Sequence, residues 1–147
     1  MSMARSRDIR PFVYAGLDVL FAALYVAAII FVVPTRIPSA AIHLWSLPAS
    51  ALIMSAGTAS AAWPKLRARG RLLAIAGGTL MLVSTILLIA RVLVSAAFLA
   101  GVYGGFGRGA FAFAALAIAL IVELVALLPI VQIRYLRSRA GRRAYAA

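Results

Sequence analysis

The chain has 147 residues, of which 65% are hydrophobic and only 12% are charged. Soluble domains contain roughly 45–50% apolar residues and about 25% charged ones, and a domain of this length has no interior large enough for the surplus. The composition therefore excludes an ordinary soluble enzyme or soluble binding module and indicates a membrane protein. The sequence contains no cysteine, which excludes disulfide bonds, thiolate catalysis and cysteine-ligated metal clusters.

The net charge is +12, from 15 basic and 3 acidic residues. Such a charge, taken alone, is typical of nucleic-acid-binding proteins. Here the basic residues stand beside apolar stretches without interleaved aromatic residues, so we expect no nucleic-acid partner. Nearly all the basic residues are arginine, a bias typical of GC-rich bacterial genomes. We therefore expect the protein in the bacterial cytoplasmic (inner) membrane.

Four apolar stretches are long enough to cross a bilayer, whose hydrocarbon core of about 30 Å requires roughly 20 helical residues. They cover approximately residues 12–33, 40–63, 72–100 and 110–133. Pro11, Pro34 and Pro64 mark the ends of the first two stretches, as expected for a residue that interrupts helical hydrogen bonding. A run of glycines between 101 and 109 separates the last two stretches and predicts a turn.

The sequence thus predicts one all-α domain over residues 1–147, an integral membrane protein built as an antiparallel bundle of four transmembrane helices. Short basic tails, 1–11 and 134–147, flank this bundle. One side of the bundle carries Arg5, Arg7, Arg10, Lys65, Arg67, Arg69, Arg71, Arg134, Arg137, Arg139, Arg142 and Arg143. The other side has only Arg36 and Arg108. Because Lys and Arg accumulate in cytoplasmic loops, both termini are expected in the cytoplasm.

Anionic lipid headgroups are the expected partners of these basic clusters, since each basic residue near a membrane surface gains about 1 kcal/mol. The residues predicted to contact these headgroups are Arg67, Arg69, Arg137 and Arg139. A homo-oligomer or a larger membrane complex is also expected, because small residues at four-residue spacing let helix backbones approach closely. The residues predicted to support this packing are Ala51, Ser55, Ala59 and Gly77. In the fourth stretch, Pro129 is expected to bend the helix near the carbonyl of Val125.

Three charged residues, Asp18, Arg91 and Glu123, fall within apolar stretches. Each is costly there, by about 2.5–3.5 kcal/mol on insertion scales for Asp, Arg or Lys at a helix centre, and is therefore a candidate functional residue. Asp18 is expected to reach toward the cytoplasmic side or to accept a hydrogen bond from a tyrosine or from the basic loop. Glu123 lies near the midplane and Arg91 in the outer part of the membrane. Whether Arg91 and Glu123 form an ion pair, within or between chains, stays open.

Three functions are compatible with these residues. The first is a non-enzymatic accessory subunit or helix-packing module. The second is a small proton- or ion-coupled transporter or channel that uses Glu123 with Asp18 and Arg91. The third is a membrane enzyme acting on a lipophilic substrate, for which no catalytic residue is evident. His43 is the only histidine and is expected to anchor the second helix at the interface, so we expect no metal and no cofactor.

Overall fold

The computed structural model describes residues 8–31 and 38–146. Arg5, Arg7 and Arg36 lie outside these ranges, and the side chain of His43 is likewise outside the described part. The elements are α1 (Arg10–Phe31), α2 (Pro38–Ala59), the short 3₁₀ turns η1 (Ser60–Ala62) and η2 (Pro64–Leu66), α3 (Arg67–Ile121), the π-helical segment η3 (Val122–Ala126), α4 (Leu127–Arg137) and α5 (Arg139–Ala144). No residue within the described ranges lies in a strand, so the predicted all-α class is confirmed.

Three helical segments are long and apolar enough to cross a membrane, as expected of an integral membrane protein. These are Arg10–Phe31, Pro64–Gly105 and Gly107–Arg137. Within the described residues, α2 does not belong to these three segments. A fourth span on α2, and the side of the membrane on which the termini lie, stay predictions.

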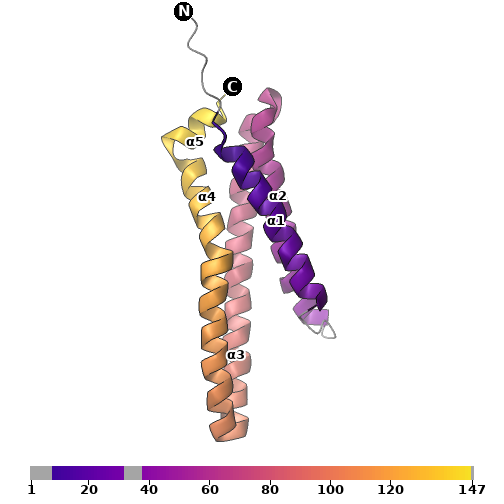
Figure 1. Cartoon of the computed structure of the whole chain (residues 1–147), viewed down its shortest axis with the longest axis vertical. Coiled ribbons are helices and arrows are strands. Elements are labelled where there is room, and N and C mark those ends of the chain that lie inside the picture. Colours follow the sequence, from indigo (N-terminus) through magenta and orange to yellow (C-terminus); the bar gives the residue numbers. More distant parts are fainter. Residues whose placement is uncertain (1–7, 32–37, 147) are drawn as a thin grey trace, which may run out of the picture.

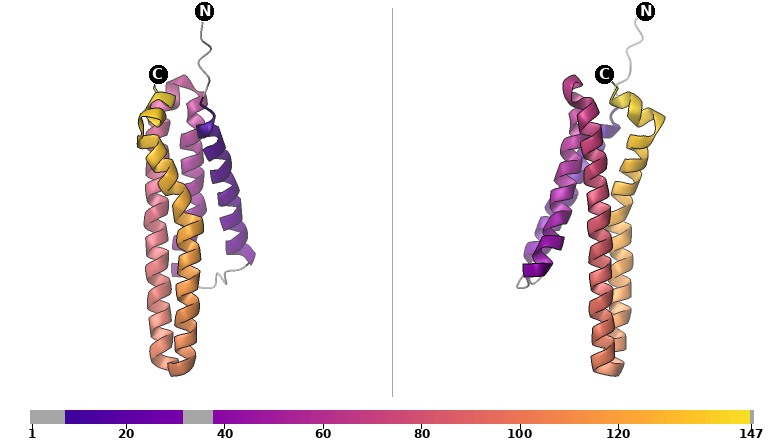
Figure 2. Two further views of the ribbon diagram at one scale, coloured as in Figure 1. Left: turned by 60° about the vertical axis from the view of Figure 1, so that its left-hand side comes forward. Right: turned by 180° about the vertical axis from the view of Figure 1, so that it is seen from behind.

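The long helix α3 is a hairpin rather than one rod. Gly104 interrupts it with φ 56° and ψ −117°, a backbone conformation that only glycine adopts without strain. The chain reverses there, as Figures 1 and 2 show at the end of the molecule farthest from the C-terminus. The turn predicted from the glycine run is confirmed at this residue. We call residues 67–103 the first arm and residues 105–121 the return arm.

A short irregular segment joins the return arm to α4. The backbone is π-helical over Val122–Ala126, and Pro129 follows three residues later. Proline has no N–H, so Pro129 cannot donate to the carbonyl of Val125, four residues earlier. A π-helical turn is one of the ways in which a helix absorbs such a missing bond. The π-helical segment therefore includes Val125, the residue near which a bend was predicted from Pro129.

The helices pack in chain order: α1 lies on α2, α2 lies on the first arm of α3, and η3 and α4 lie on that arm as well. The start of α1, the η1–η2 connection and α5 gather at one end of the molecule (Figure 1), which we call the basic end. Two groups of buried side chains hold the helices together. The first group, in the middle, contains Ala22, Leu47, Ala51, Met81 and Val125. The second group, at the basic end, contains Ala61, Ala74, Tyr135, Leu136 and Tyr145.

The α3 hairpin extends well beyond α1 and α2. Ser46 of α2 donates a hydrogen bond to Ser84 of α3 over 2.9 Å, and the two helices are antiparallel. Eight residues further along each helix, Pro38 at the start of α2 lies level with Val92. The first arm therefore continues for about 16 Å past α2, at 1.5 Å per residue. We call residues 93–115 the distal hairpin; Figures 1 and 2 show it projecting alone.

Candidate functional site

A buried acid and a buried amide meet between α1 and α4. The side-chain nitrogen Nε2 of Gln132 donates to Oδ1 of Asp18 over 2.6 Å, and both side chains are fully buried. The sequence-based expectation that a tyrosine or the basic loop would supply the donor is wrong. Gln132 supplies it because its side chain projects from α4 to the face of α1 that carries Asp18.

This pair leaves unused acceptors around it. Within the described residues, Oδ2 of Asp18, Oε1 of Gln132 and the hydroxyl of Tyr25 are buried without a hydrogen-bond partner. Most buried polar atoms in proteins have a partner, so the second oxygen of Asp18 and the oxygen of Gln132 are unusual. Tyr25 lies seven residues beyond Asp18 on α1, about 10 Å at 1.5 Å per residue, and its hydroxyl is a separate buried group. A carboxyl oxygen, an amide oxygen and a phenol are groups that bind a proton, a water molecule or a small cation.

A second polar contact joins the start of α1 to the end of α4. The hydroxyl of Tyr135 donates to Asp8 over 2.8 Å, and the ring of Tyr14 lies 5.4 Å from the ring of Tyr135. The guanidinium of Arg10 lies 5.9 Å from the centre of the same ring, a distance at which cation–π attraction is felt. Asp8 thus bonds across the bundle, and its oxygen Oδ1 also accepts from the backbone N–H of Arg10 at the start of α1.

The C-terminal segment is folded against the bundle. Tyr145 is buried, and its hydroxyl donates to the backbone oxygen of Thr58 in α2 over 3.0 Å. Burial raises the pKa of Tyr145 to about 12, and the carboxyl groups of Asp18 and Asp8 act in the same direction. The segment that was described from sequence as a tail, 134–147, therefore contains a buried side chain, Tyr145, that bonds to α2.

The three charged residues predicted within the membrane occupy three separate places. Asp18 is buried at Gln132, nine residues beyond Glu123 along the last helices, which is about 13 Å at 1.5 Å per residue. Glu123 is exposed on the outside of the chain. Arg91 is half-buried and lies ten residues, about 15 Å, beyond Met81 on the first arm. Met81 packs in the core with Val125, two residues from Glu123, so the register sets Arg91 and Glu123 well apart along the hairpin.

The predicted packing residues lie between the first three helices. Ala51 is buried in the middle core, Ser55 donates to the backbone oxygen of Ala15 over 3.0 Å, and Ala59 is half-buried. A Cβ added to Gly77 would lie 2.8 Å from the backbone nitrogen of Met54, so this glycine allows α2 and α3 to touch.

Sequence reasoning missed two glycines with the same role. A Cβ on Gly57 would overlap the backbone nitrogen of Ala74, and a Cβ on Gly70 would overlap the side chain of Ser60. Gly57 lies in a run of small residues, 55–59, which is a sequence signal for close helix packing. Gly70 stands between Arg69 and Arg71 and offered no such signal. Gln132 was also missed. It is an amide within the last apolar stretch, nine residues after Glu123, and a polar side chain in such a stretch is the signal that could have identified it.

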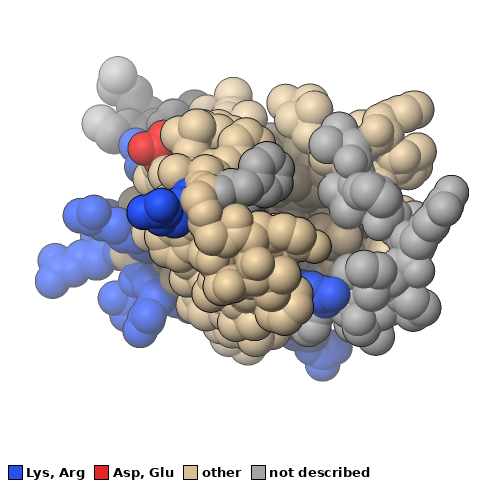
Figure 3. Space-filling view, turned by 90° about the horizontal axis from the view of Figure 1, so that it is seen from below, with Lys and Arg blue, Asp and Glu red and all other residues tan. Residues whose placement is uncertain are grey.

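Most of the basic side chains are exposed around the basic end. Arg69, Arg137 and Arg139 are exposed, whereas half-buried Arg67 donates to the backbone oxygen of Ala61 over 3.1 Å. Seen from the distal end, blue side chains gather mainly on the side where α4 and α5 lie in Figure 1 (Figure 3). Half-buried Arg71 donates to the backbone oxygen of Leu136 over 2.8 Å, which ties α3 to the end of α4.

Comparison of the chain with protein-family models, with curated proteins and with solved structures finds no match. The function is therefore argued from the geometry of the chain itself.

Proposed function

We propose that the protein is a non-enzymatic helix-packing module whose copies associate through the distal hairpin. The observation that carries this proposal is the exposure of that hairpin. Its large apolar side chains that are exposed are Leu93, Val94, Phe98, Leu99, Val102, Tyr103, Phe111 and Phe113. Among its residues with described side chains, Ala96, Gly107 and Ala114 are buried along its own seam.

The thickness of a bilayer explains why the lipid hydrocarbon does not bury the apolar side chains of the distal hairpin. Helix α1 has 22 residues and is about 33 Å long, which matches a hydrocarbon core of about 30 Å. The hydrogen bond from Ser55 to Ala15 sets the register of α1 on α2, so Phe31 ends level with the start of α2. A membrane that covers α1 upright therefore leaves the distal hairpin outside the hydrocarbon, where an exposed apolar surface favours a protein partner.

Small residues on the hairpin favour a second copy as that partner. Ala90, Ala97 and Gly101 follow one face of the first arm at steps of seven and four, and all three are exposed. Exposed Ala112, Ala115 and Ala119 follow one face of the return arm at steps of three and four. Copies inserted in the same direction hold both faces at the same depth, so one copy's first arm can approach its neighbour's return arm closely.

The separation of the three charges supports this function over transport. A transporter of the kind considered from sequence would bring Asp18, Arg91 and Glu123 to one cavity, whereas their register sets them apart. The proposed topology has four spans, with the basic end on the cytoplasmic side of a bacterial inner membrane, because the basic clusters gather there.

The test measures the number of copies per particle in nanodiscs and in mild detergent. Ala97→Ile places a bulky side chain on the proposed interface, and we expect it to shift oligomers to monomers. Ala23→Ile is the matched control, because Ala23 is an equally small, exposed residue on α1, and it should leave the copy number unchanged. A wild-type chain that is strictly monomeric in both media, with no co-purifying protein, would contradict the proposal.

The buried pair of Asp18 and Gln132 supports a second candidate function, proton- or ion-coupled transport. The pair offers two unpartnered oxygen atoms, and ionisable residues within membranes commonly belong to proton or ion pathways. In liposomes, Asp18→Asn should then reduce proton or cation flux, while Asp8→Asn, which changes an acid outside the apolar segments, and Glu123→Gln, which changes an exposed acid remote from Asp18, should not. Absence of flux in the wild type, or equal flux in all variants, excludes this function.

A further inference from the structure

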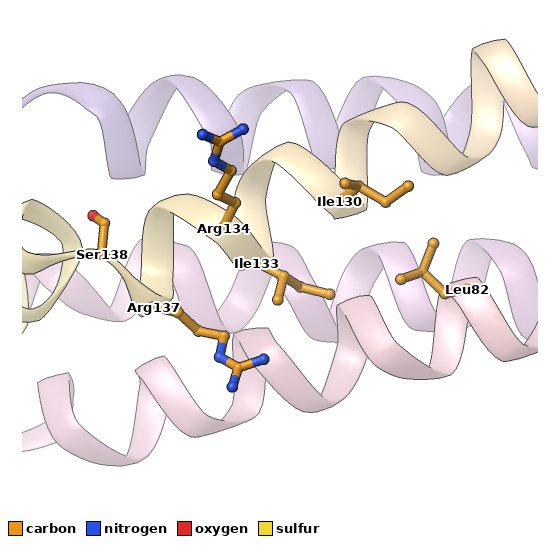
Figure 4. Close-up of a pocket in the computed structure, with 6 residues that line it drawn as sticks. All are labelled: Leu82, Ile130, Ile133, Arg134, Arg137 and Ser138. Atoms are coloured by element: carbon orange, nitrogen blue, oxygen red, sulfur yellow. The ribbon is translucent and has the colours of Figure 1, made fainter.

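A groove runs along the outside of α4 at the basic end. It has a volume of about 520 Å³ and is lined by Leu82, Ile130, Ile133, Arg134, Arg137 and Ser138. Figure 4 shows the apolar side chains toward the middle of the molecule and the arginines toward Ser138, where α4 ends. The groove is therefore amphipathic along its length, with an apolar part and a cationic part. Its volume lies within the range of about 300–1,000 Å³ that is usual for ligand sites.

The helices hold the groove in a fixed shape. A Cβ added to Gly78 would lie 3.0 Å from the side chain of Ile133, so the glycine lets Ile133 pack directly on α3. The bond from Arg71 to the oxygen of Leu136 fixes the end of α4 on the same helix. Ser138 then ends α4 with an extended backbone, and its hydroxyl donates to the oxygen of Tyr135 and accepts from the N–H of Gly141.

The chain's own acids leave the charge of this groove uncompensated. Asp8 accepts from Tyr135 and lies beside Arg10, and Asp18 accepts from Gln132. Glu123 lies eleven residues before Arg134, about 16 Å along the helix. Within the described ranges, no acidic side chain forms an ion pair with Arg134 or Arg137. Both arginines are exposed and leave α4 on opposite sides of the groove (Figure 4).

We propose that this groove binds one membrane lipid with an anionic phosphate headgroup. The phosphate lies at the cationic end of the groove, and the exposed side chains of Arg134 and Arg137 turn toward it from their two sides to bind its oxygens by charge-assisted hydrogen bonds. One acyl chain lies on Leu82, Ile130 and Ile133. A lipid fits better than a free phosphate ion because a free ion does not bury the apolar part of the groove. The site is independent of the distal hairpin, which lies at the opposite end of the molecule.

Native mass spectrometry of the delipidated protein with phosphatidylglycerol, and with zwitterionic phosphatidylcholine, tests the site. We expect one tightly retained phosphatidylglycerol per chain. The double variant Arg134→Gln/Arg137→Gln should weaken its retention by about tenfold or more, as two lost headgroup contacts imply. The double variant Arg142→Gln/Arg143→Gln removes the same charge from exposed positions on α5 and should retain the lipid.

A third variant separates shape from charge. Leu82→Trp fills the apolar part of the groove without a change in charge and should also weaken retention, with circular dichroism to verify the helical fold. Equal losses in both arginine double variants would show a diffuse effect of charge and overturn the proposal. Equal retention of the two lipids, or complete displacement of phosphatidylglycerol by inorganic phosphate, would overturn it as well.

Discussion

Asp18 of α1 and Gln132 of α4 are in direct hydrogen-bond contact over 2.6 Å, although 114 residues separate them in the chain. Both side chains are fully buried, where a polar group without a partner is costly. The bond therefore links the first helix to the last apolar helix and favours a single position of α4 against α1. It also sets the depth at which Tyr14 and Tyr135 meet one turn nearer the basic end.

A double-mutant cycle measures this link. Asp18→Leu and Gln132→Leu should each reduce the free energy of unfolding, because each leaves the other polar side chain buried without its partner. The double variant should lose less than the sum of the two, with a coupling energy of about 0.6–1.7 kcal/mol, as is usual for hydrogen bonds in membrane proteins. Reversible unfolding in mixed micelles provides the values. Strictly additive losses would contradict a direct bond.

The close approach of α2 and α3 depends on Gly57. A Cβ at this position would overlap the backbone nitrogen of Ala74, and backbone cannot move aside as a flexible side chain can. Gly57→Ala should therefore destabilise the protein by about 1–3 kcal/mol, as overpacking does. Gly16→Ala is the matched control: nothing lies within 4 Å of an added Cβ there, and a helical Gly→Ala exchange gains up to about 1 kcal/mol. If the two variants change stability equally, α2 and α3 are not in contact at Gly57.

The reversal of the α3 hairpin depends on Gly104. Its φ of 56° with ψ of −117° is strained for any residue with a Cβ, by about 1–3 kcal/mol. Gly104→Ala should lower the free energy of unfolding by that amount, whereas Gly109→Ala, which replaces a helical glycine in open space, should not. The measurement is the same unfolding titration. An unchanged Gly104→Ala variant would mean that the chain turns elsewhere in the glycine run.

Periodicity and composition were enough to predict the helices, the glycine turn and the disturbance before Pro129, because each depends on local backbone chemistry. The partners of buried side chains were harder to predict. Asp18 was recognised as costly in an apolar helix, but its partner depends on the position of α4, which follows from contacts between helices such as those of Gly78 with Ile133 and of Arg71 with Leu136. The burial of Tyr145 near the C-terminus could not be predicted either, because it depends on a contact with Thr58, which is distant in the sequence.

The length of the hairpin is another property that the sequence left open. The first arm has no charge between Arg71 and Arg91 and none from Val92 to Tyr103, so hydropathy does not show where the bilayer ends. The register with α2, fixed by the contact of Ser46 with Ser84, is what places the distal hairpin beyond the other helices. Such a register follows from side-chain contacts between helices and not from either helix alone.

Tyr145 makes stability depend on pH in the alkaline range. Folding raises the pKa of its hydroxyl from 10.0 to about 12, so the folded protein holds the phenol proton more tightly than the unfolded chain does. Its contribution to stability is complete below pH 10 and is lost as the pH rises through 12.

Tyr145→Phe removes both the hydrogen bond to Thr58 and this titration. The variant should be less stable than the wild type by about 0.5–1.5 kcal/mol at neutral pH, and the difference should shrink between pH 10 and 12. Tyr103→Phe, which removes an exposed hydroxyl, is the control and should follow the wild type at every pH. A difference between Tyr145→Phe and the wild type that stays constant up to pH 12 would show that the Tyr145 hydroxyl is not buried against α2.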